Sequence, residues 1–500
     1  YKLYYLSGLK NYCYYIYIMQ TILCKEGYLI KKNKKSEKII EELKKELKVT
    51  PFNPYQFSMR KKGKDESFVV YQENDDYLSI PKFYGIKKFG KANVNEELSG
   101  KKNKLKFNGK LRDYQEPIVK KSLKHIKELD GGLISVGCGK GKTCMSLYIA
   151  CKLKVKTLVI VHKTFLLNQW VDRIKQFTNA EIGIIQQKKI DIEGKDIVIG
   201  MIQSIAKGNY DKEIFKDFGF IIFDEAHHAP SKYFSRALPI INCKKSLALS
   251  ATPKRSDKLE KLIFWYLGPL IYKSPVEENK NVIVNMIKYN LNSKAFREYK
   301  LPYNAGVNRP KTLTKICQIK KRNKFIAKTL KKVMEESGRK ILVLSDRIEH
   351  LELIKELLDE KIFATSDFYI GGRKQKDLDI AAEAQIILAT FSMASEALDI
   401  PALNTLFMVT SRREIEQSVG RILRKKDHPV QPLILDMVDQ LKTFVNQGVQ
   451  RRRFYKRNNY QIKLIDVDDN KIISEEDVTN KKIKTFKHVN VNLDEVGFLD

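Results

Sequence analysis

Short apolar runs alternate with amphipathic stretches through most of the chain. The first series of runs is Leu133–Val136, Thr157–Val161, Ile197–Gly200, Phe220–Phe223 and Leu247–Leu249. The second series is Ile341–Leu344, Phe368–Ile370, Ile386–Ala389, Thr405–Val409 and Pro432–Leu435. Continuous apolar strands separated by amphipathic helices predict parallel sheets that are covered on both faces. We therefore expect an α/β protein with two tandem parallel-sheet domains, at 106–275 and 311–445.

The flanking segments are patterned differently. Residues 19–105 predict a small basic α+β module, with a helix across Ser36–Leu47 and a strand at Tyr77–Ile80. Residues 276–310 are polar and are expected to form a linker or small extension between the domains, and 446–500 a basic and then acidic tail.

The first 18 residues are rich in Tyr and precede Met19. They lack the clean apolar core and the small-residue cleavage site of a signal peptide. We expect them to be a non-native or disordered extension, with Met19 as the start of the protein.

The amino-acid composition indicates the kind of molecule that this protein binds. Lys and Arg total 93 against 59 Asp and Glu, a net charge of +34, which indicates a polyanionic partner such as nucleic acid. The seven cysteines form no C-x-x-C pair, so neither a disulfide framework nor structural zinc is expected. No apolar run is long enough to predict a membrane span.

The apolar run at Leu133 leads into a loop with three glycines, followed by Lys142 and Thr143. A strand, a glycine loop and a helix that opens with Lys-Thr form a phosphate-binding loop. Lys142 is then placed for the β- and γ-phosphates and Thr143 for Mg²⁺. The residues expected to cradle the nucleotide are Gly137, Cys138, Gly139, Lys140, Gly141, Lys142 and Thr143. One position departs from the usual pattern, because Val136 stands where it asks for glycine; the alternative is a glycine-rich loop that binds nothing.

Asp224 and Glu225 follow the apolar run Phe220–Phe223. After a buried strand, such a pair can hold Mg²⁺ through Asp224 and polarise the attacking water through Glu225. His227 and His228 could suggest a metal site, but adjacent histidines chelate poorly and no other ligands cluster near them. The following run ends in Ser250-Ala-Thr, whose hydroxyls could link the nucleotide site to a second site, or simply form a turn.

A basic segment near the end of the second domain contains Arg421 and Arg424, with Gly420 before them. Three residues apart, the arginines would share one face of a helix. A forked, permanently charged side chain stabilises charge that develops on a transferred phosphoryl group. With a phosphate loop upstream, the segment predicts arginine fingers; alone, it would be a solvent-facing helix.

Together these motifs resemble superfamily 2 helicases of the DEAH-lettered kind, which have two RecA-like domains. The resemblance covers about 106–445. It implies ATP and Mg²⁺ as cofactors, with Gln115 on the adenine, Asp399 in motif V as a further nucleotide contact, and Gln417 catalytic beside the two arginines. It also implies nucleic-acid contacts from His162, Lys163, Gln169, Gln203, Ser204, Ser345, Arg347 and Thr390. Relatives usually carry glycine at position 397, where this chain has Ala.

Leu166–Trp170 and Tyr77–Gly85 resemble the XPB-like branch, and within it the helicases of large cytoplasmic DNA viruses, including the poxviral transcript-release type. The resemblance implies a DNA translocase in viral transcription or in repair, with RNA polymerase or transcription factors as possible partners. The location would be host cytoplasm or virion for a viral protein, and otherwise the nucleus. The alternatives are an RNA helicase, the motor of a restriction or repair nuclease, and an inactive nucleic-acid-binding protein.

Overall fold

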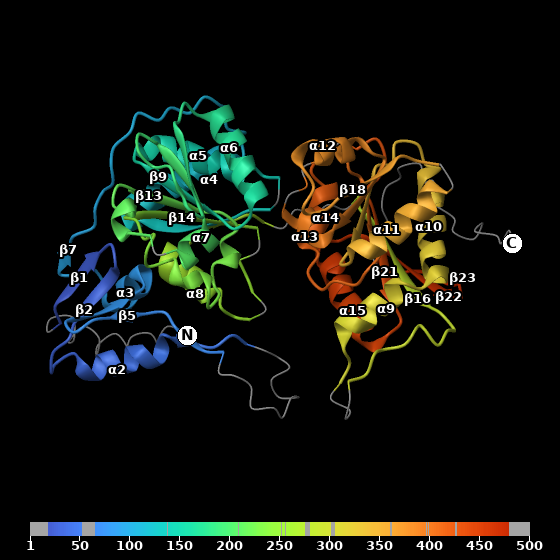
Figure 1. Ribbon diagram of the computed structural model, residues 1–500, viewed down its shortest axis with the longest axis horizontal. Helices are drawn as coiled ribbons and strands as arrows, with labels where there is room; N and C mark the ends of the chain where they lie inside the picture. The colour runs from blue at the N-terminus through green and yellow to red at the C-terminus, as the bar shows by residue number, and fades with distance from the viewer. Residues whose placement is uncertain are drawn as a thin grey trace. The chain divides into compact units, whose positions relative to one another are not determined.

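The computed structural model divides into two compact units, residues 1–274 and 275–500, each built on its own sheets (Figure 1). The described residues are 19–52, 66–137, 139–208, 210–251, 253–255, 257–275, 281–301, 306–360, 363–396, 398, 400–425 and 428–479. The predictions made for residues 1–18, Cys138 and Asp399 lie outside them.

A small sheet opens the first unit, with strand order β5-β6-β2-β1-β7. Its strands are β1 (Thr21–Cys24), β2 (Gly27–Lys31), β5 (Gln72–Glu73), β6 (Tyr77–Ile80) and β7 (Val94–Asn95). Helix α2 (Glu37–Glu46) confirms the helix predicted from sequence and buries Ile39, Ile40 and Leu43. Helix α3 (Lys82–Phe89) follows β6, and β3 (Lys48–Val49) pairs with β4 (Phe68–Val69).

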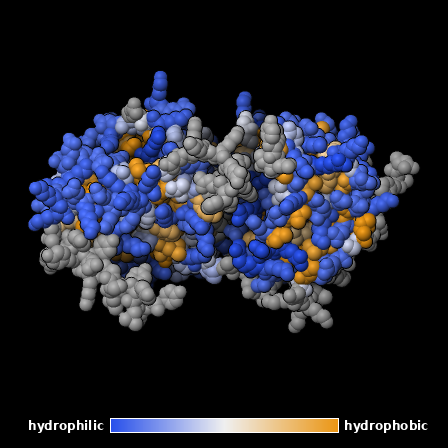
Figure 2. All heavy atoms as spheres, turned by 90° about the horizontal axis from the view of Figure 1, so that it is seen from below, coloured by the Kyte–Doolittle hydropathy of each residue, from blue (hydrophilic) through white to orange (hydrophobic). Residues whose placement is uncertain are grey.

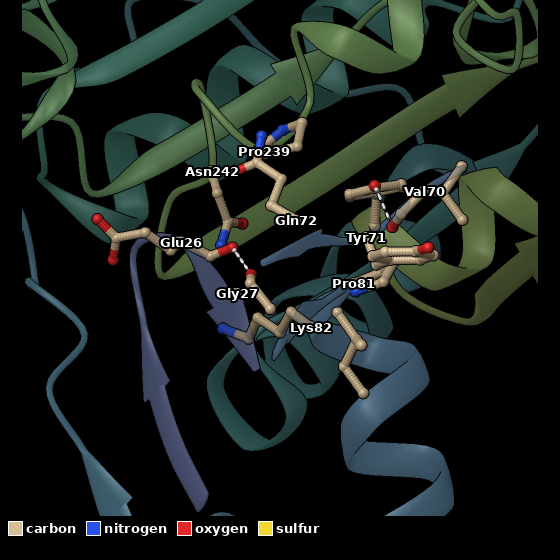
Figure 3. A pocket seen from close by; sticks show the side chains of 12 residues that line it. Glu26, Gly27, Val70, Tyr71, Gln72, Pro81, Lys82, Pro239 and Asn242 are labelled. Atoms are coloured by element: carbon tan, nitrogen blue, oxygen red, sulfur yellow. Dashed lines mark hydrogen bonds between the residues drawn. The ribbon is translucent and has the colours of Figure 1, made fainter. Parts of the chain in front are cut away.

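The module packs directly on the larger part of the first unit. Glu26, Gly27 and Lys82 of the module lie against Pro239 and Asn242 of the larger part (Figure 3). The cavity between them has a volume of only about 10 Å³. Asn242 Nδ2 donates to the carbonyl of Lys25 at 3.0 Å, and Tyr266 Oη donates to that of Val70 at 3.0 Å. The Lys82 ammonium lies 2.5 Å from Glu97 Oε1 and donates to the Lys244 carbonyl, with both side chains of the ion pair almost fully buried.

The large sheet of the first unit has the order β11-β10-β12-β9-β13-β14-β8-β15. Its strands are β8 (Gly131–Ser135), β9 (Thr157–Val161), β10 (Ile182–Gln186), β11 (Lys189–Ile190), β12 (Ile197–Met201), β13 (Phe220–Phe223), β14 (Lys245–Ser250) and β15 (Leu270–Lys273). All neighbours are parallel except β10 and β11. Its helices are α4 (Gln115–Leu129), α5 (Lys142–Leu153), α6 (Thr164–Phe177), α7 (Ile202–Lys207) and α8 (Lys261–Leu267).

Successive residues of one strand enter two different cores. In β9, Leu158 and Ile160 belong to one hydrophobic cluster, whereas Val159 and Val161 belong to another. Because side chains alternate along a strand, both faces of this sheet are buried. This explains why the strands appear in the sequence as continuous apolar runs, and it confirms the predicted α/β class.

The second unit repeats the architecture, with strand order β18-β19-β17-β20-β21-β16-β22-β23. Its strands are β16 (Ile283–Asn290), β17 (Ile341–Ser345), β18 (Ser366–Tyr369), β19 (Ile386–Thr390), β20 (Thr405–Met408), β21 (Leu433–Asp439), β22 (Gln461–Asp468) and β23 (Lys471–Asp477). Only the last pair is antiparallel. Its helices are α9 (Arg309–Cys317), α10 (Lys320–Met334), α11 (Ile348–Asp359), α12 (Gln375–Glu383), α13 (Phe391–Glu396), α14 (Glu416–Ile422) and α15 (Lys442–Arg457).

Two segments differ from the sequence expectation. Within 276–310, β16 is an interior strand between β21 and β22, and within 446–500 the chain continues α15 and adds two more strands. In both places buried polar side chains hide the apolar pattern. Asn285 is a buried residue of β16, and the buried Arg451 of α15 forms an ion pair with Asp436 at 2.8 Å.

The surface drawn in Figure 2 is mostly hydrophilic, with hydrophobic residues scattered among the polar ones. Scattered exposed apolar residues are normal for a folded protein in water. Among the described residues, no helix combines the length and apolar character that crossing a membrane requires.

Candidate nucleotide-binding and hydrolysis site

The glycine loop joins the carboxyl end of β8 to α5, as the sequence predicts. Gly139 and Gly141 have φ of +76° and +72°, the left-handed region that favours glycine. A Cβ on Gly141 would lie 2.4 Å from Gln115 Nε2. Val136 is 2% exposed and belongs to the hydrophobic core of the sheet, so the residue that departs from the usual pattern packs inward.

Gln115 at the start of α4 holds this loop. Its Oε1 accepts from Arg112 N at 3.0 Å, and its Nε2 donates to the Lys140 carbonyl at 3.0 Å. Tyr114 Oη donates to the same carbonyl at 3.1 Å, and the Lys140 ammonium lies 5.8 Å from the Tyr114 ring. The buried amide of Gln115 therefore contacts the loop backbone, and the 41% exposed Tyr114 ring lies beside it.

Asp224 and Glu225 lie at the carboxyl end of β13, close to the loop. Lys142 Nζ is 3.8 Å from Glu225 Oε1 and 3.4 Å from the Val136 carbonyl. Asp224 Oδ2 accepts from Trp170 Nε1 at 2.8 Å, and its Oδ1 accepts from the backbone N–H of Glu225 at 2.9 Å. The structure thus brings together Lys142, Asp224 and Glu225, which the sequence analysis placed in one site.

The two carboxyl groups have pKa values shifted in opposite directions. Burial and the adjacent Glu225 charge raise the pKa of Asp224. Burial alone would also raise the pKa of Glu225, but the charge of Lys142 and the hydrogen bond from His227 outweigh it and lower that pKa. Glu225 is therefore ionised at neutral pH, and a cation beside Asp224 would favour the charged form of Asp224.

His227 connects this pair to the end of the next strand. Its Nδ1 lies 3.3 Å from Glu225 Oε2 and 3.1 Å from the buried Ser250 Oγ. The centre of the His228 ring lies 4.2 Å from that of His227 and 4.1 Å from that of His162, with the rings tilted to one another. Ser250 Oγ therefore reaches the Glu225 carboxylate through the His227 ring, and Thr252 lies outside the described residues.

Sequence reasoning assigned no role to Trp170 or Arg255. Trp170 is 1% exposed and supplies the indole donor to Asp224. Arg255 Nη1 donates to the His227 carbonyl, and its Nε donates to Asp257 Oδ1 at 2.8 Å. The Asp257 carbonyl accepts from Phe52 N at 2.9 Å, so these contacts run from the N-terminal module to His227 and Glu225. The Arg-x-Asp spacing after Ser250-Ala-Thr-Pro is the only sequence signal for this connection.

The residues around the loop fit Mg²⁺ better than zinc. No group of three His, Cys, Asp or Glu able to hold a metal occurs in the described part of the chain. Thr143, the second residue of α5, and Asp224 offer one hydroxyl and one carboxylate. Mg²⁺ commonly binds through one or two carboxylates, with water and phosphate oxygens completing its octahedron.

The expected nucleic-acid residues of the first unit are partly engaged with the protein itself. Gln203 Nε2 donates to the carbonyl of the buried His162, and Ser204 Oγ accepts from Gln187 N at 2.9 Å. The ammonium of Lys163 lies 5.9 Å from the Phe165 ring, and Gln169 is half-buried on α6. These residues follow the carboxyl ends of β9 and β12, the edge that also carries the phosphate loop.

In the second unit, Ser345 is fully buried, and its Oγ lies 3.0 Å from His350 Nδ1 and accepts from Arg347 N. Arg347 Nε donates to Thr314 Oγ1 at 3.1 Å. Thr390 is half-buried at the end of β19, with its Oγ1 3.3 Å from Ser392 Oγ.

The two arginines do not share a helix face, because α14 ends at Ile422 before Arg424 is reached. Arg421 is 5% exposed and donates to the carbonyls of Ala394 and Leu398 at 2.6 and 2.9 Å. The terminal Leu423 has φ −111° and ψ 15°, which takes the chain out of helical geometry. Gln417 is half-buried on α14.

Comparison with known proteins agrees with this geometry. Residues 108–255 match the family described as "Type III restriction enzyme, res subunit". A protein of Acanthamoeba polyphaga mimivirus, assigned as an ATP-dependent RNA helicase, is 38% identical over 454 residues, covering 89% of this chain and 86% of the viral protein. The chain belongs to the superfamily 2 helicases.

Further relatives of this helicase differ in their named substrate. A DNA 3'-5' translocase of Sulfurisphaera tokodaii is 27% identical over 403 residues, covering 69% of this chain and 84% of the translocase. A restriction-modification enzyme solved with DNA aligns with TM-score 0.52 and 19% identity, over 72% of this chain and 32% of that enzyme, which supports the fold alone. The protein is therefore an ATP-dependent nucleic-acid helicase with ATPase activity.

Proposed function

We propose that this helicase uses ATP hydrolysis to translocate along duplex DNA. The observation that carries the chemistry is the cluster of Lys142, Asp224 and Glu225 beside the phosphate loop, with the Lys142 ammonium 3.8 Å from Glu225. In the proposed reaction Lys142 turns to the β- and γ-phosphates when ATP binds. Glu225, ionised at neutral pH, then accepts a hydrogen bond from the attacking water and draws its proton.

Thr143 and Asp224 are the residues that would hold Mg²⁺, which when bound neutralises charge on the β- and γ-phosphate oxygens. Trp170 keeps the Asp224 carboxylate in one orientation by donating to one of its oxygens. Arg421 and Arg424 are proposed as arginine fingers, with Gln417 beside them. Arg421 would have to exchange its contacts with the Ala394 and Leu398 carbonyls for the nucleotide.

DNA as the track is supported by the XPB-type translocase among the relatives and by the net charge of +34. The basic N-terminal module at 19–105 would act as a second grip on the duplex, since it packs on the same unit as the ATP site. By analogy with the viral relatives, we propose a role in transcript release or repair, in association with RNA polymerase or transcription factors.

RNA is the second candidate substrate, because the mimivirus relative is assigned as an RNA helicase. ATP turnover should be measured without nucleic acid and with duplex DNA, single strands and RNA, using Lys142→Ala as the inactive control. We expect duplex DNA to stimulate at least as well as single strands, and a third strand to be displaced from a DNA triplex when ATP is present. Stimulation by RNA alone, with no triplex displacement, would replace this proposal by an RNA helicase.

A further inference from the structure

A surface groove of about 410 Å³ lies on the second unit, along one side of α9, the short helix labelled in Figure 1. The groove is wide open to solvent, so a ligand would lie across it and would not be enclosed by it. The residues that line it are Tyr299, Pro310, Lys311, Thr314, Lys315 and Gln318. None of them belongs to the nucleotide site or to the helicase motifs described above.

Tyr299 is held firmly although its side chain is exposed. Its backbone N–H donates to Thr312 Oγ1 at 2.9 Å, and its carbonyl accepts from Asn308 N at 2.8 Å. Both partners lie at the start of α9, so the backbone of Tyr299 is fixed to this helix. The residue nevertheless remains 42% exposed. An aromatic ring on a fixed backbone is a surface on which a flat group can stack at low entropic cost.

The polar side of the groove is basic. Lys311 and Lys315 lie on the exposed side of α9 and the exposed Gln318 caps its end, while Leu313 and Ile316 on the other side are buried. The Lys311 ammonium lies over the Tyr299 ring, 4.8 Å from its centre, so a base that stacks on this face displaces the ammonium toward the phosphate. The chain from Lys294 to Lys315 contains a single acidic residue and several lysines and arginines. A flat ring beside a cation complements a nucleotide, which has a flat base next to a phosphate.

Arg347 connects this groove to the helicase motifs. Its Nε donates to Thr314 Oγ1 at 3.1 Å, and its Nη2 donates to the Pro310 carbonyl at 3.4 Å. Both acceptors belong to residues that line the groove. The side chain that was expected to contact nucleic acid thus supports the wall of the groove.

We propose that this groove is a binding site for an unpaired nucleotide of single-stranded nucleic acid, with the base on Tyr299 and the phosphates on Lys311 and Lys315. The base must be unpaired, because only an unstacked base offers its face to an aromatic side chain. The inference rests on nucleic-acid binding by this helicase and is independent of the duplex-DNA track proposed above. Arg347 acts as a positioning residue, because its side chain contacts α9 and not the bound nucleic-acid strand.

The test is fluorescence anisotropy of labelled oligo-dT, oligo-U and a blunt DNA duplex with the full chain, without ATP. Tyr299→Ala should weaken single-strand binding about tenfold, equivalent to ~1.4 kcal/mol and within the range for a base stacked on an aromatic ring. Tyr299→Phe keeps the ring and should bind like wild type. Neither change removes the backbone hydrogen bonds of residue 299, so both variants should fold.

The lysines are tested through salt dependence. Lys311→Ala/Lys315→Ala should reduce the slope of log affinity against log salt by about 0.7 for each phosphate of a single strand that these lysines neutralise. The matched control, Lys324→Ala/Lys331→Ala, removes two exposed lysines of α10 that do not line the groove and should leave the slope nearly unchanged.

Wild-type affinity of Tyr299→Ala for both oligo-dT and oligo-U would overturn the proposal, as would equal slopes for the two lysine pairs. A loss confined to oligo-dT or to oligo-U would support the site and identify the strand it takes. A loss as large for the blunt duplex would overturn it, because a paired base cannot stack on the ring. The duplex-translocation proposal fails separately, if duplex DNA does not stimulate ATP turnover by the wild-type protein.

Discussion

Replacing Lys82 by Met should weaken the packing of the N-terminal module on the rest of the first unit and lower the stability of that unit. The side chains of Lys82 and Glu97 are 1% and 2% exposed, and their charged atoms are 2.5 Å apart. Lys82 bonds to Glu97 Oε1, and the buried Glu97 Oε2 has no hydrogen-bond partner among the described residues. Methionine keeps the unbranched stem but removes the ammonium, which leaves a buried carboxylate without its counter-charge.

Breaking one partner of a buried ion pair costs about 3–5 kcal/mol. For a unit of this size, each kcal/mol shifts the melting temperature by about 2–4 °C, so Lys82→Met should lower it by about 6–20 °C. Lys88→Met is the matched control on the same helix. Its partner Glu46 is 48% exposed, and surface pairs contribute only about 0.2–1 kcal/mol.

The loss of melting temperature caused by Lys82→Met should be larger at high pH than at low pH. Burial raises the pKa of Glu97, and Lys82 opposes that rise, so removing Lys82 raises this pKa further. A carboxyl whose folded pKa lies above its unfolded value stabilises the fold below the unfolded pKa, and this contribution is lost as pH rises. The melting difference between variant and wild type should therefore be smaller near pH 5 than near pH 8, with Lys82→Met/Glu97→Leu recovering stability at both. An equal loss of melting temperature at both pH values, or a loss no larger than that of Lys88→Met, would show that the buried Lys82–Glu97 pair does not stabilise the module.

Three further predictions concern side chains inside the two units. His227→Ala should raise the pKa of Glu225 and move the acid limb of kcat/KM for ATP to higher pH; an unchanged limb would show that the 3.3 Å contact does not influence Glu225. Arg421→Ala should lower the hydrolysis rate at saturating ATP by about 10³ or more if the side chain acts as an arginine finger. It should also lower the melting temperature, because the Ala394 and Leu398 carbonyls lose their donor. A loss of ATP affinity without a rate defect would argue against the finger role. Arg322→Met should destabilise the second unit by about 3–5 kcal/mol in urea unfolding, because Asp439 is fully buried at 2.8 Å from it, and Arg322→Met/Asp439→Leu should recover most of the loss.

Structure is predicted most reliably from this sequence where one physical requirement allows few backbone conformations or few positions in the fold. The phosphate loop follows from glycines that must adopt positive φ between a buried strand and a helix, and Asp224 and Glu225 follow from their place at the end of an apolar run. The two-sheet α/β class follows from strands that are buried on both faces, which makes their runs continuous.

Prediction fails where a polar residue is buried with a partner distant in sequence. Arg451 looks solvent-exposed in a basic run, yet Asp436 and the Ser411 hydroxyl enclose it. Trp170 looks like an ordinary core aromatic, and its donation to Asp224 depends on α6 packing beside the end of β13, which is distant in sequence. The pairing of Arg421 with Arg424 assumed a longer helix than α14, whose end depends on the local backbone at Leu423.

The most direct test of the central claim is ATP binding and hydrolysis by Glu225→Gln, measured with saturating nucleic acid. The substitution keeps the size of the side chain but removes the charge that polarises the attacking water. Positioned acid–base groups typically contribute about 10² to 10⁴ in rate. We expect near wild-type ATP affinity with turnover reduced by at least about 10². Wild-type turnover would show that Glu225 is not the group that activates water.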